Sequence, residues 1–315
     1  MELFIAFITA FTLTLVMVPL FIKLFIKKKM GQAIREEGPT WHQAKTGTPT
    51  MGGTVFMIVS CLVSLVMAWL FNCLDGKILM LVSAWFLFGT IGFADDFISV
   101  FKKTNEGLTA KQKFLIQLIF AGIVMVIGYS LQEEIAIPFG PWQITQFLLV
   151  FIFAFFWITG FSNAVNLTDG LDGLATGLSV IAYGAYFMLA LREGHRSLAL
   201  ASLVLIACLL GFLVYNRRPA KIFMGDVGSL SLGAGLATLS ISLNHPWSLL
   251  LIGLVFVLET LSVIIQVTSF KTRGKRVFKM APVHHHFEMI GWSEEKVVAV
   301  FWGLGLLASL LYFVL

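Results

Sequence analysis

The chain is a succession of long apolar stretches separated by short polar loops. Stretches of about 20 residues, the length of helix that crosses the hydrocarbon of a bilayer, fall at roughly 2–26, 51–74, 78–94, 113–131, 143–161, 173–191, 197–215, 227–243, 247–270 and 296–315. We therefore predict an all-α polytopic membrane protein of about ten transmembrane helices. No soluble segment interrupts the pattern, so residues 1–315 are predicted to form one integral membrane domain.

Basic residues divide the loops into two sets. The loops after the first, third, fifth, seventh and ninth stretches hold all of the 22 Lys and Arg residues except Lys77, Arg192 and Arg196. Short loops rich in Lys and Arg stay in the cytoplasm, so we predict five cytoplasmic loops and both termini outside. The first stretch is too long for a signal peptide and lacks a small-residue cleavage site, which indicates a retained helix.

Composition supports this class of protein. Hydrophobic residues make up 58% of the chain and charged residues 12%, whereas soluble domains average about 25% charged. The net charge of +5 is explained by the basic loops, and no motif resembles a nucleic-acid module, so no nucleic-acid partner is expected. Cys61, Cys73 and Cys208 lie in apolar stretches without metal-ligand spacing and are interpreted as packing residues.

Acidic residues gather beside the apolar stretches on the predicted cytoplasmic side. Asp95 and Asp96 end the third stretch, Asp169 and Asp172 follow the fifth, and Asp226 precedes the eighth. A carboxylate in the bilayer costs about 2.5–3.5 kcal/mol on insertion scales, and an isolated acid near a helix end can simply reach back to water. Five acids at one interface instead favour Mg²⁺, which is usually held by one or two carboxylates together with substrate phosphate.

The spacing of Asn166, Asp169 and Asp172 permits two local structures. Polar residues three apart share a face if the segment is helical, whereas the glycines that follow both aspartates indicate a loop-like entry into the next stretch. Helix capping explains one of these acids but not the group. Asp226 could likewise cap the eighth stretch, and here we favour a metal ligand.

The loop Lys45-Thr-Gly-Thr-Pro-Thr50-Met-Gly-Gly supplies a cation, hydroxyls and glycines just before an apolar stretch. It could cap that helix, with Thr50 as the N-cap residue. It could equally cradle a diphosphate with backbone N–H groups and Lys45. A Walker-type phosphate loop is absent from the sequence, which disfavours nucleotide hydrolysis by that route.

Three consecutive histidines, His284, His285 and His286, precede Glu288 in the last polar loop. Adjacent residues do not readily face one ion, and zinc motifs space their histidines further apart. We therefore favour imidazoles that donate to phosphate or sugar oxygens over a zinc site. Glu259, midway along the ninth stretch, is either a site residue or an acid paired inside the bundle.

These motifs, read in order, resemble one enzyme family. The loop at Lys45, Gly-Phe-Ala-Asp95-Asp96, Asn166-Leu-Thr-Asp169-Gly-Leu-Asp172-Gly, Phe223-Met-Gly-Asp226-Val-Gly-Ser229 and Ala-Pro-Val-His284-His-His-Phe-Glu are similar to the phospho-N-acetylmuramoyl-pentapeptide-transferase (MraY) family. That family belongs to the polyprenyl-phosphate N-acetylhexosamine-1-phosphate transferases. The Asp-Asp and Asn-x-x-Asp elements occur across the superfamily, whereas the triple-histidine loop is characteristic of the muramoyl branch.

The resemblance implies a reaction, a cofactor and partners. Phospho-MurNAc-pentapeptide would pass from UDP-MurNAc-pentapeptide to undecaprenyl phosphate, giving lipid I and UMP with Mg²⁺, in the first membrane step of peptidoglycan synthesis. The family fold is ten helices in a homodimer, with a lipid groove beside a bent ninth helix. The protein would lie in the cell membrane as a multi-pass chain with its active site on the cytoplasmic face.

The resemblance also implies site residues. Asp226 would bind Mg²⁺. Asp95, Asp96 and Asp169 would be the acidic residues of the catalytic site, and His285 would also belong to it. Asp95 or Asp96 is a suggested base for the lipid phosphate. The expected substrate-binding positions are Lys45, Thr50, Lys111, Asn166, Asp172, Asn216, Phe223, Ser229, Gln266, His284 and His286.

One position departs from the family pattern. Many members carry Lys three residues after the second Asp of the pair, where this chain has Ser99. Lys103, Lys111 or Lys113 could supply the missing cation, and the sequence does not choose among them.

Two other functions and one mechanistic question stay open. A GlcNAc-1-phosphate transferase of the same superfamily is disfavoured by the triple-histidine loop. A secondary transporter would place polar groups at the midplane of inverted repeats, and no repeat is found. Direct displacement and a covalent aspartyl intermediate are not separated by the sequence.

Overall fold

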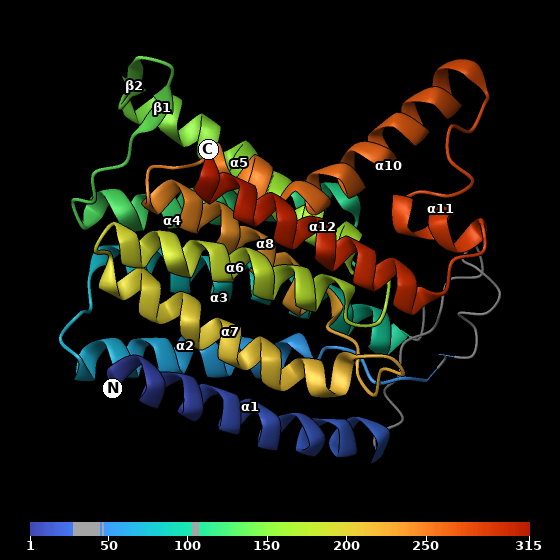
Figure 1. Ribbon diagram of the computed structural model, residues 1–315, viewed down its shortest axis with the longest axis horizontal. Coiled ribbons are helices and arrows are strands. Elements are labelled where there is room, and N and C mark those ends of the chain that lie inside the picture. The colour runs from blue at the N-terminus through green and yellow to red at the C-terminus, as the bar shows by residue number, and fades with distance from the viewer. Residues whose placement is uncertain (28–44, 46, 103–106) are drawn as a thin grey trace.

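The computed structural model describes residues 1–27, 45, 47–102 and 107–315. The helices pack together into a single bundle (Figure 1). Their bounds are α1 Glu2–Lys27, α2 Gly53–Leu70, α3 Gly76–Lys102, α4 Ala110–Ser130, α5 Phe147–Thr168, α6 Leu174–Arg192, α7 Arg196–Asn216, α8 Gly225–Ser242, α9 Ser248–Ile252, α10 Leu254–Arg273, α11 Val283–Met289 and α12 Glu294–Val314. The predicted all-α membrane class is therefore confirmed.

The helix α8 occupies the centre of the bundle. Nine of the described helices are long and apolar enough to span a membrane, and α8, which matches the eighth predicted stretch, is the long helix outside this set. Every residue from Val227 to Ser242 is buried, so packing against α3 and α5 replaces contact with lipid. A Cβ at Gly233 would collide with the carbonyl of Phe161 on α5, which is why small residues let these backbones approach closely.

Two helices extend further than the apolar stretches predicted. We expected 78–94 and 143–161, whereas α3 runs to Lys102 and α5 to Thr168. Helical hydrogen bonding continues beyond the apolar core because the backbone can stay paired in the interfacial region. Asp95, Asp96 and Asn166 consequently lie on helices, in the parts that extend beyond the predicted apolar stretches.

The start of the fifth predicted stretch is a β-hairpin instead of helix. Strands β1 Ile137–Phe139 and β2 Trp142–Ile144 pair antiparallel, with Ile137 opposite Ile144. Gly140, with a φ of +59°, lies in the connecting turn, and such a backbone conformation favours glycine. The first residues of the predicted stretch, 143 and 144, thus belong to strand β2, and helix α5 begins only at Phe147.

The ninth predicted stretch, 247–270, is broken into two helices. The short helix α9 ends at Ile252, and α10 begins at Leu254 after the break at Gly253. Helix α10 then points away from the other helices (Figure 1), and Val255, Phe256, Glu259 and Ser262 are its buried residues. The single stretch predicted from hydropathy was wrong, because hydropathy does not register a change of helix direction, whereas the bent ninth helix that the family resemblance implies agrees with this break.

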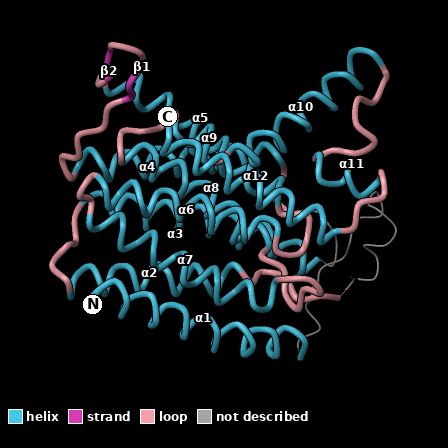
Figure 2. Tube along the Cα trace, viewed as in Figure 1, coloured by secondary structure: helices cyan, strands magenta, loops and turns pink. Residues whose placement is uncertain are grey.

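The bundle has two distinct ends (Figure 2). At one end, Arg196 at the start of α7 donates to Glu2 at 2.8 Å, and Tyr312 near the end of α12 lies 3.3 Å from Nδ1 of His245. Both termini therefore lie at this end. The acidic motifs lie at the other end, where α1, α3, α5 and α7 finish and α2, α4, α6 and α8 begin.

Candidate active site

Three carboxylates from two helices meet at the acidic end. Asp95 and Asp96 lie on α3, and Asp226 lies in the first turn of α8. The Lys113 ammonium, on α4, forms an ion pair and hydrogen bond with Asp226 and lies 3.6 Å from Asp95 Oδ2. Among the described residues, Lys113 is the one cation in contact with these acids.

Asp96 faces the start of α8. Its Oδ2 accepts a hydrogen bond from the backbone N–H of Val227 at 3.2 Å, where the helix dipole favours negative charge. Gly225 has a φ of +73°, and a Cβ there would collide with the Asp96 carboxylate. Glycine at this position thus allows the carboxylate to reach the helix terminus.

Asn166 fixes the opposite side of Asp226. Its Nδ2 donates to Asp226 Oδ1 at 2.8 Å and to Ser229 Oγ at 2.9 Å. Asp226 therefore does not cap α8, whose N-cap residue is Met224. Its two oxygens are instead presented to partners on α4 and α5.

The oxygen ligands of this group fit a magnesium ion. Mg²⁺ prefers carboxylate oxygens, retains several waters and usually takes only one or two protein carboxylates. Across the part of the chain that the structure describes, no set of three His, Cys, Asp or Glu side chains is arranged to enclose a metal. Asp226 with a neighbouring carboxylate nevertheless supplies the small ligand set that Mg²⁺ uses when substrate phosphate completes the coordination.

Asp169 stands directly after the last residue of α5. Helix α5 ends at Thr168, and Asp169 has a non-helical backbone with φ −79° and ψ 56°. Burial raises the pKa of the Asp169 carboxyl to about 7, and the negative charges of Asp226 and Asp172 add to the rise. A carboxyl that titrates near neutral pH is well suited to hold or release a proton.

The loop-like interpretation of the segment after Asn166 is the correct one. Gly173 has a φ of +77° and precedes α6, so Asn166, Asp169 and Asp172 do not share one helical face. Asn166 reaches Asp226, whereas Asp172 faces Lys45. The turn between α5 and α6 therefore supplies two neighbouring parts of the site.

A second charged cluster surrounds Lys45. Its ammonium lies 2.7 Å from Asp172 Oδ1 and 2.6 Å from Glu294 Oε1. The other Asp172 oxygen accepts from the backbone N–H of Ala220 at 3.0 Å, and Arg218 lies 3.4 Å from Glu294. Lys45 is thus already paired with two carboxylates.

Two glycine-rich loops lie side by side between these clusters. Phe223 N donates to the Pro49 carbonyl at 2.8 Å, and Gly52 N donates to the Phe223 carbonyl at 2.9 Å. Gly52 occupies the N-cap position of α2 and makes no side-chain capping bond, so the interpretation of Thr50 as N-cap was wrong. The Thr50 hydroxyl is buried without a hydrogen-bond partner, and Phe223, on the facing loop, is partly exposed.

The three histidines lie on the short helix α11, and each faces a different partner. His284 is fully buried, with Nδ1 3.1 Å from Glu259 Oε1 on α10. His285 Nδ1 lies 2.8 Å from Glu288, and His286 Nδ1 accepts from the backbone N–H of Lys279 at 3.1 Å. Glu259 therefore lies inside the protein against His284, itself one of the predicted substrate-binding residues.

Several predicted substrate-binding residues are engaged with the protein itself. Asn216 is buried, accepts from Thr176 Oγ1 at 2.6 Å and donates to the Ile222 carbonyl at 3.0 Å. Gln266 accepts from the backbone N–H groups of Val277 and Phe278, both at 2.9 Å. These contacts hold the loops that border the site.

The three candidate cations are separated by the structure. Lys113 contacts Asp226, whereas Lys111, two residues earlier on α4, is exposed on the surface. Lys103 lies outside the described residues, as do Lys28, Lys29 and Arg35 of the first basic loop.

Glu294 and Arg218 are parts of the Lys45 cluster that the sequence did not reveal. Glu294 lies 249 positions from Lys45 in the chain, and an acid in the first turn of a helix is an ordinary feature. No local pattern could have distinguished it.

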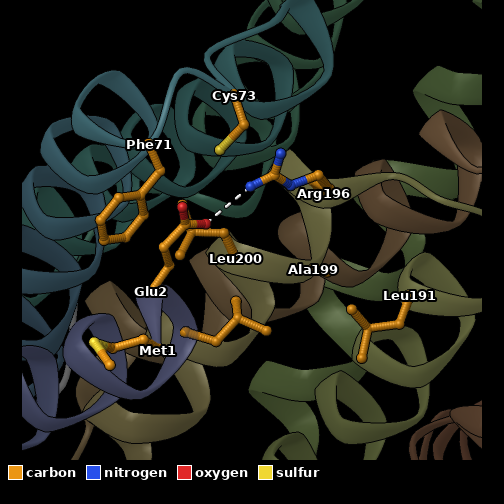
Figure 3. A pocket seen from close by; sticks show the side chains of 9 residues that line it. Met1, Glu2, Phe71, Cys73, Leu191, Arg196, Ala199 and Leu200 are labelled. Carbon is orange, nitrogen blue, oxygen red and sulfur yellow. Dashed lines mark hydrogen bonds and ion pairs between the residues drawn. The ribbon is translucent and has the colours of Figure 1, made fainter.

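A hollow of about 410 Å³ lies at the opposite end of the bundle (Figure 3). Its wall includes Phe71, Cys73 and the Glu2–Arg196 ion pair. It is remote from the acids, because it lies where α1 and α7 begin.

Comparison with known proteins identifies the family. Residues 78–244 match the model described as glycosyl transferase family 4. The phospho-N-acetylmuramoyl-pentapeptide-transferase of Lactobacillus gasseri is 53% identical over 314 residues, which cover 99% of this chain and 98% of the relative. The enzymes of that name from Enterococcus faecalis and Staphylococcus aureus are 50% identical over 310 residues (98% of this chain, 96% of the relative) and 51% identical over 314 residues (98% of each chain). Together with the multi-pass helical bundle, these similarities show that the chain belongs to the phospho-N-acetylmuramoyl-pentapeptide-transferase family and is a membrane-embedded glycosyl-1-phosphate transferase.

Proposed function

We propose that this enzyme transfers phospho-MurNAc-pentapeptide from UDP-MurNAc-pentapeptide to undecaprenyl phosphate, forming lipid I and releasing UMP. The relatives that span the whole chain carry the name of this transferase. The observation that carries the proposal at the site is the grouping of Asp95 and Asp226 around the Lys113 ammonium, with Asp96 beside them at the start of α8. Acidic oxygens beside a cation suit a reaction between two anionic phosphates.

The reaction needs positioning more than covalent chemistry from the protein. A lipid phosphate oxygen would bond to the sugar-bearing phosphorus, and the bond from that phosphorus to the bridging oxygen would break, with its electron pair leaving on UMP. Lys113 would offset negative charge as these groups approach. Because the lipid phosphate is already ionised near neutral pH, Asp95 or Asp96 would orient it or accept a residual proton.

Mg²⁺ is the proposed cofactor. Asp226 would hold it, and the ion would neutralise diphosphate oxygens and the UMP leaving group. Asn166 would keep the Asp226 carboxylate in place through its 2.8 Å hydrogen bond.

The Asp169 turn, the Lys45 cluster and α11 would bind the rest of the nucleotide-sugar. Thr50, Phe223, Ser229 and the histidines lie on segments that border the carboxylates, and His285 is the histidine proposed to touch substrate. A homodimer is proposed as the working assembly.

Release of UMP is the direct test of the function. The purified chain in detergent should release UMP from UDP-MurNAc-pentapeptide only when both undecaprenyl phosphate and Mg²⁺ are present, and EDTA should stop the reaction until Mg²⁺ is restored. Turnover of UDP-GlcNAc in place of the muramoyl substrate would instead assign the enzyme to the GlcNAc-1-phosphate branch.

We also propose that the acidic end faces the cytoplasm of the cell membrane, since the basic loops lie there. A cysteine replacing Lys275 should be shielded from an impermeant thiol reagent outside intact cells, while one replacing Lys77 or Arg192 should react. The reverse pattern would place the carboxylates outside.

A further inference from the structure

Glu294 is a buried carboxylate of the Lys45 cluster, and the proposed reaction gives it no role of its own. It is the first residue of α12 and is only 5% exposed. Its Oε1 accepts from Lys45 Nζ at 2.6 Å and from the Asp172 backbone N–H at 2.8 Å, while Oε2 lies 3.4 Å from Arg218. Both oxygens are thus directed at residues from other segments.

Starting a helix does not explain these contacts. Ser293 already caps α12 by accepting from the Lys296 N–H, and Glu295 supplies a second acid in the same turn while staying 62% exposed. An acid needed only for the helix dipole can remain in water. Burying a carboxylate is costly unless it is paired and hydrogen-bonded, so the position of Glu294 reflects its partners.

Those partners join segments far apart in the chain. Glu294 links α12 to the Lys45 loop and to the turn between α5 and α6, and Asp172 in that turn also accepts from the Ala220 N–H. An ammonium has three N–H donors. Asp172 and Glu294 take two of the Lys45 donors, which leaves one donor with a fixed direction.

We infer that Glu294 is a positioning residue for the nucleotide-sugar, acting through Lys45 and the Asp172 turn. The inference rests on the proposed function. A lysine loses rotational freedom on binding a ligand, and a side chain already held in place avoids part of that cost. Glu294 therefore converts a flexible cation into one oriented donor, and its removal should weaken substrate binding more than the chemical step.

The test is a steady-state comparison of Glu294→Ala with Glu295→Ala in the full-length enzyme. Glu294→Ala should raise KM for UDP-MurNAc-pentapeptide roughly 10- to 100-fold, the effect of losing a hydrogen bond to a charged group. The kcat and the KM for undecaprenyl phosphate should change little. The matched control Glu295→Ala removes a neighbouring acid that also contacts Arg218 and should leave all three constants unchanged.

A double-mutant cycle shows whether Glu294 acts through Lys45. In a Lys45→Met background, adding Glu294→Ala should raise KM by much less than it does alone, because residues that share one interaction are not additive. Equal effects in both backgrounds would overturn the inference.

Glu294→Gln keeps the side-chain volume and one acceptor oxygen, so it decides the matter if the alanine variant does not fold. It should raise the same KM about three- to tenfold, since a charged hydrogen bond is roughly twice as strong as a neutral one. An unchanged KM in a folded Gln variant would overturn the inference while the proposed function stands. If the unmodified enzyme releases no UMP, the proposed function fails and the inference falls with it.

Discussion

The two charged clusters at the acidic end differ in how well their charges are matched. Around Lys45, the carboxylates of Asp172 and Glu294 face Lys45 and Arg218, and each makes several close contacts. Around Asp226, three carboxylates gather beside Lys113, which contacts Asp95 and Asp226 and is the one cation that the described residues bring into contact with the group. A matched cluster can hold loops together by itself, whereas an excess of negative charge calls for another cation.

This difference assigns separate tasks to the clusters. The two carboxylates of the Lys45 cluster are buried and each contacts a cation, which suits the shaping of a binding surface. The Asp226 cluster has oxygens but too little positive charge, which suits a site that takes up Mg²⁺ with an anionic substrate. Changes in the first cluster should therefore alter KM, and changes in the second should alter kcat.

The largest effect is expected from Asp226→Asn. The substitution keeps size but removes the charge proposed to bind Mg²⁺, so kcat for UMP release should fall by at least about 100-fold, the scale of a lost key electrostatic contact. Thermal unfolding in detergent should verify that the variant is folded. Near-normal turnover would show that Asp226 does not bind the metal, and the proposed difference in task between the two clusters would then be wrong.

Lys113→Met should have the next largest effect. Loss of the cation between Asp226 and Asp95 should lower kcat about 10- to 100-fold, as expected for one charged hydrogen bond. Lys111→Met is the comparison, since Lys111 lies on the same helix but is exposed; its effect should stay within about twofold. If Lys111→Met is the more damaging change, the exposed Lys111, and not Lys113, supplies the cation that many family members carry at the position of Ser99.

The choice between these lysines shows where sequence reasoning reaches its limit. The apolar stretches predict the helices because lipid thickness sets their length, and the motifs predict which loops carry the acids. Which side chain reaches Asp226, however, depends on the rotation of α4 against α3, and hydropathy does not encode it.

The hydropathy pattern showed neither the break at Gly253, which only the family resemblance suggested as a bent ninth helix, nor the contact of Glu294 with Lys45, and the reasons are related. The apolar run continues through the break, so composition alone shows one helix. Glu294 meets Lys45 only after α12 packs beside α6, and such a contact between distant segments leaves no local signal.

The His285→Ala variant, together with metal analysis of the purified protein, tests whether the metal lies at the Asp226 cluster or at α11. We expect about a five- to tenfold loss of transfer, as for one lost hydrogen bond, in an enzyme that contains no stoichiometric zinc and recovers with Mg²⁺ after chelation. His286→Ala is the matched control, because His286 accepts from a backbone N–H of its own loop. One zinc per chain, lost in His285→Ala, would move the metal from the carboxylates to α11.

A change of stability with pH, in place of a change in turnover, is expected from Asp169, which lies between the two clusters. Burial and the neighbouring acids raise its folded-state pKa from 3.8 to about 7. The folded protein therefore holds a proton that the unfolded chain has released, and the stability this provides is lost as pH rises from about 4 to about 7. A shift of about three units corresponds to at most about 4 kcal/mol.

Asp169→Asn removes this titration without changing side-chain size. The Tm of the variant minus the Tm of the unmodified protein, both measured in detergent, should increase as pH rises from 5 to 8. Most of this increase should occur below about pH 7. The difference between the two proteins isolates Asp169 from other titrating groups, which are common to both. Parallel Tm curves over this range would mean that Asp169 is already ionised in the folded protein, so the excess negative charge at the Asp226 cluster would extend into the turn that also carries Asp172.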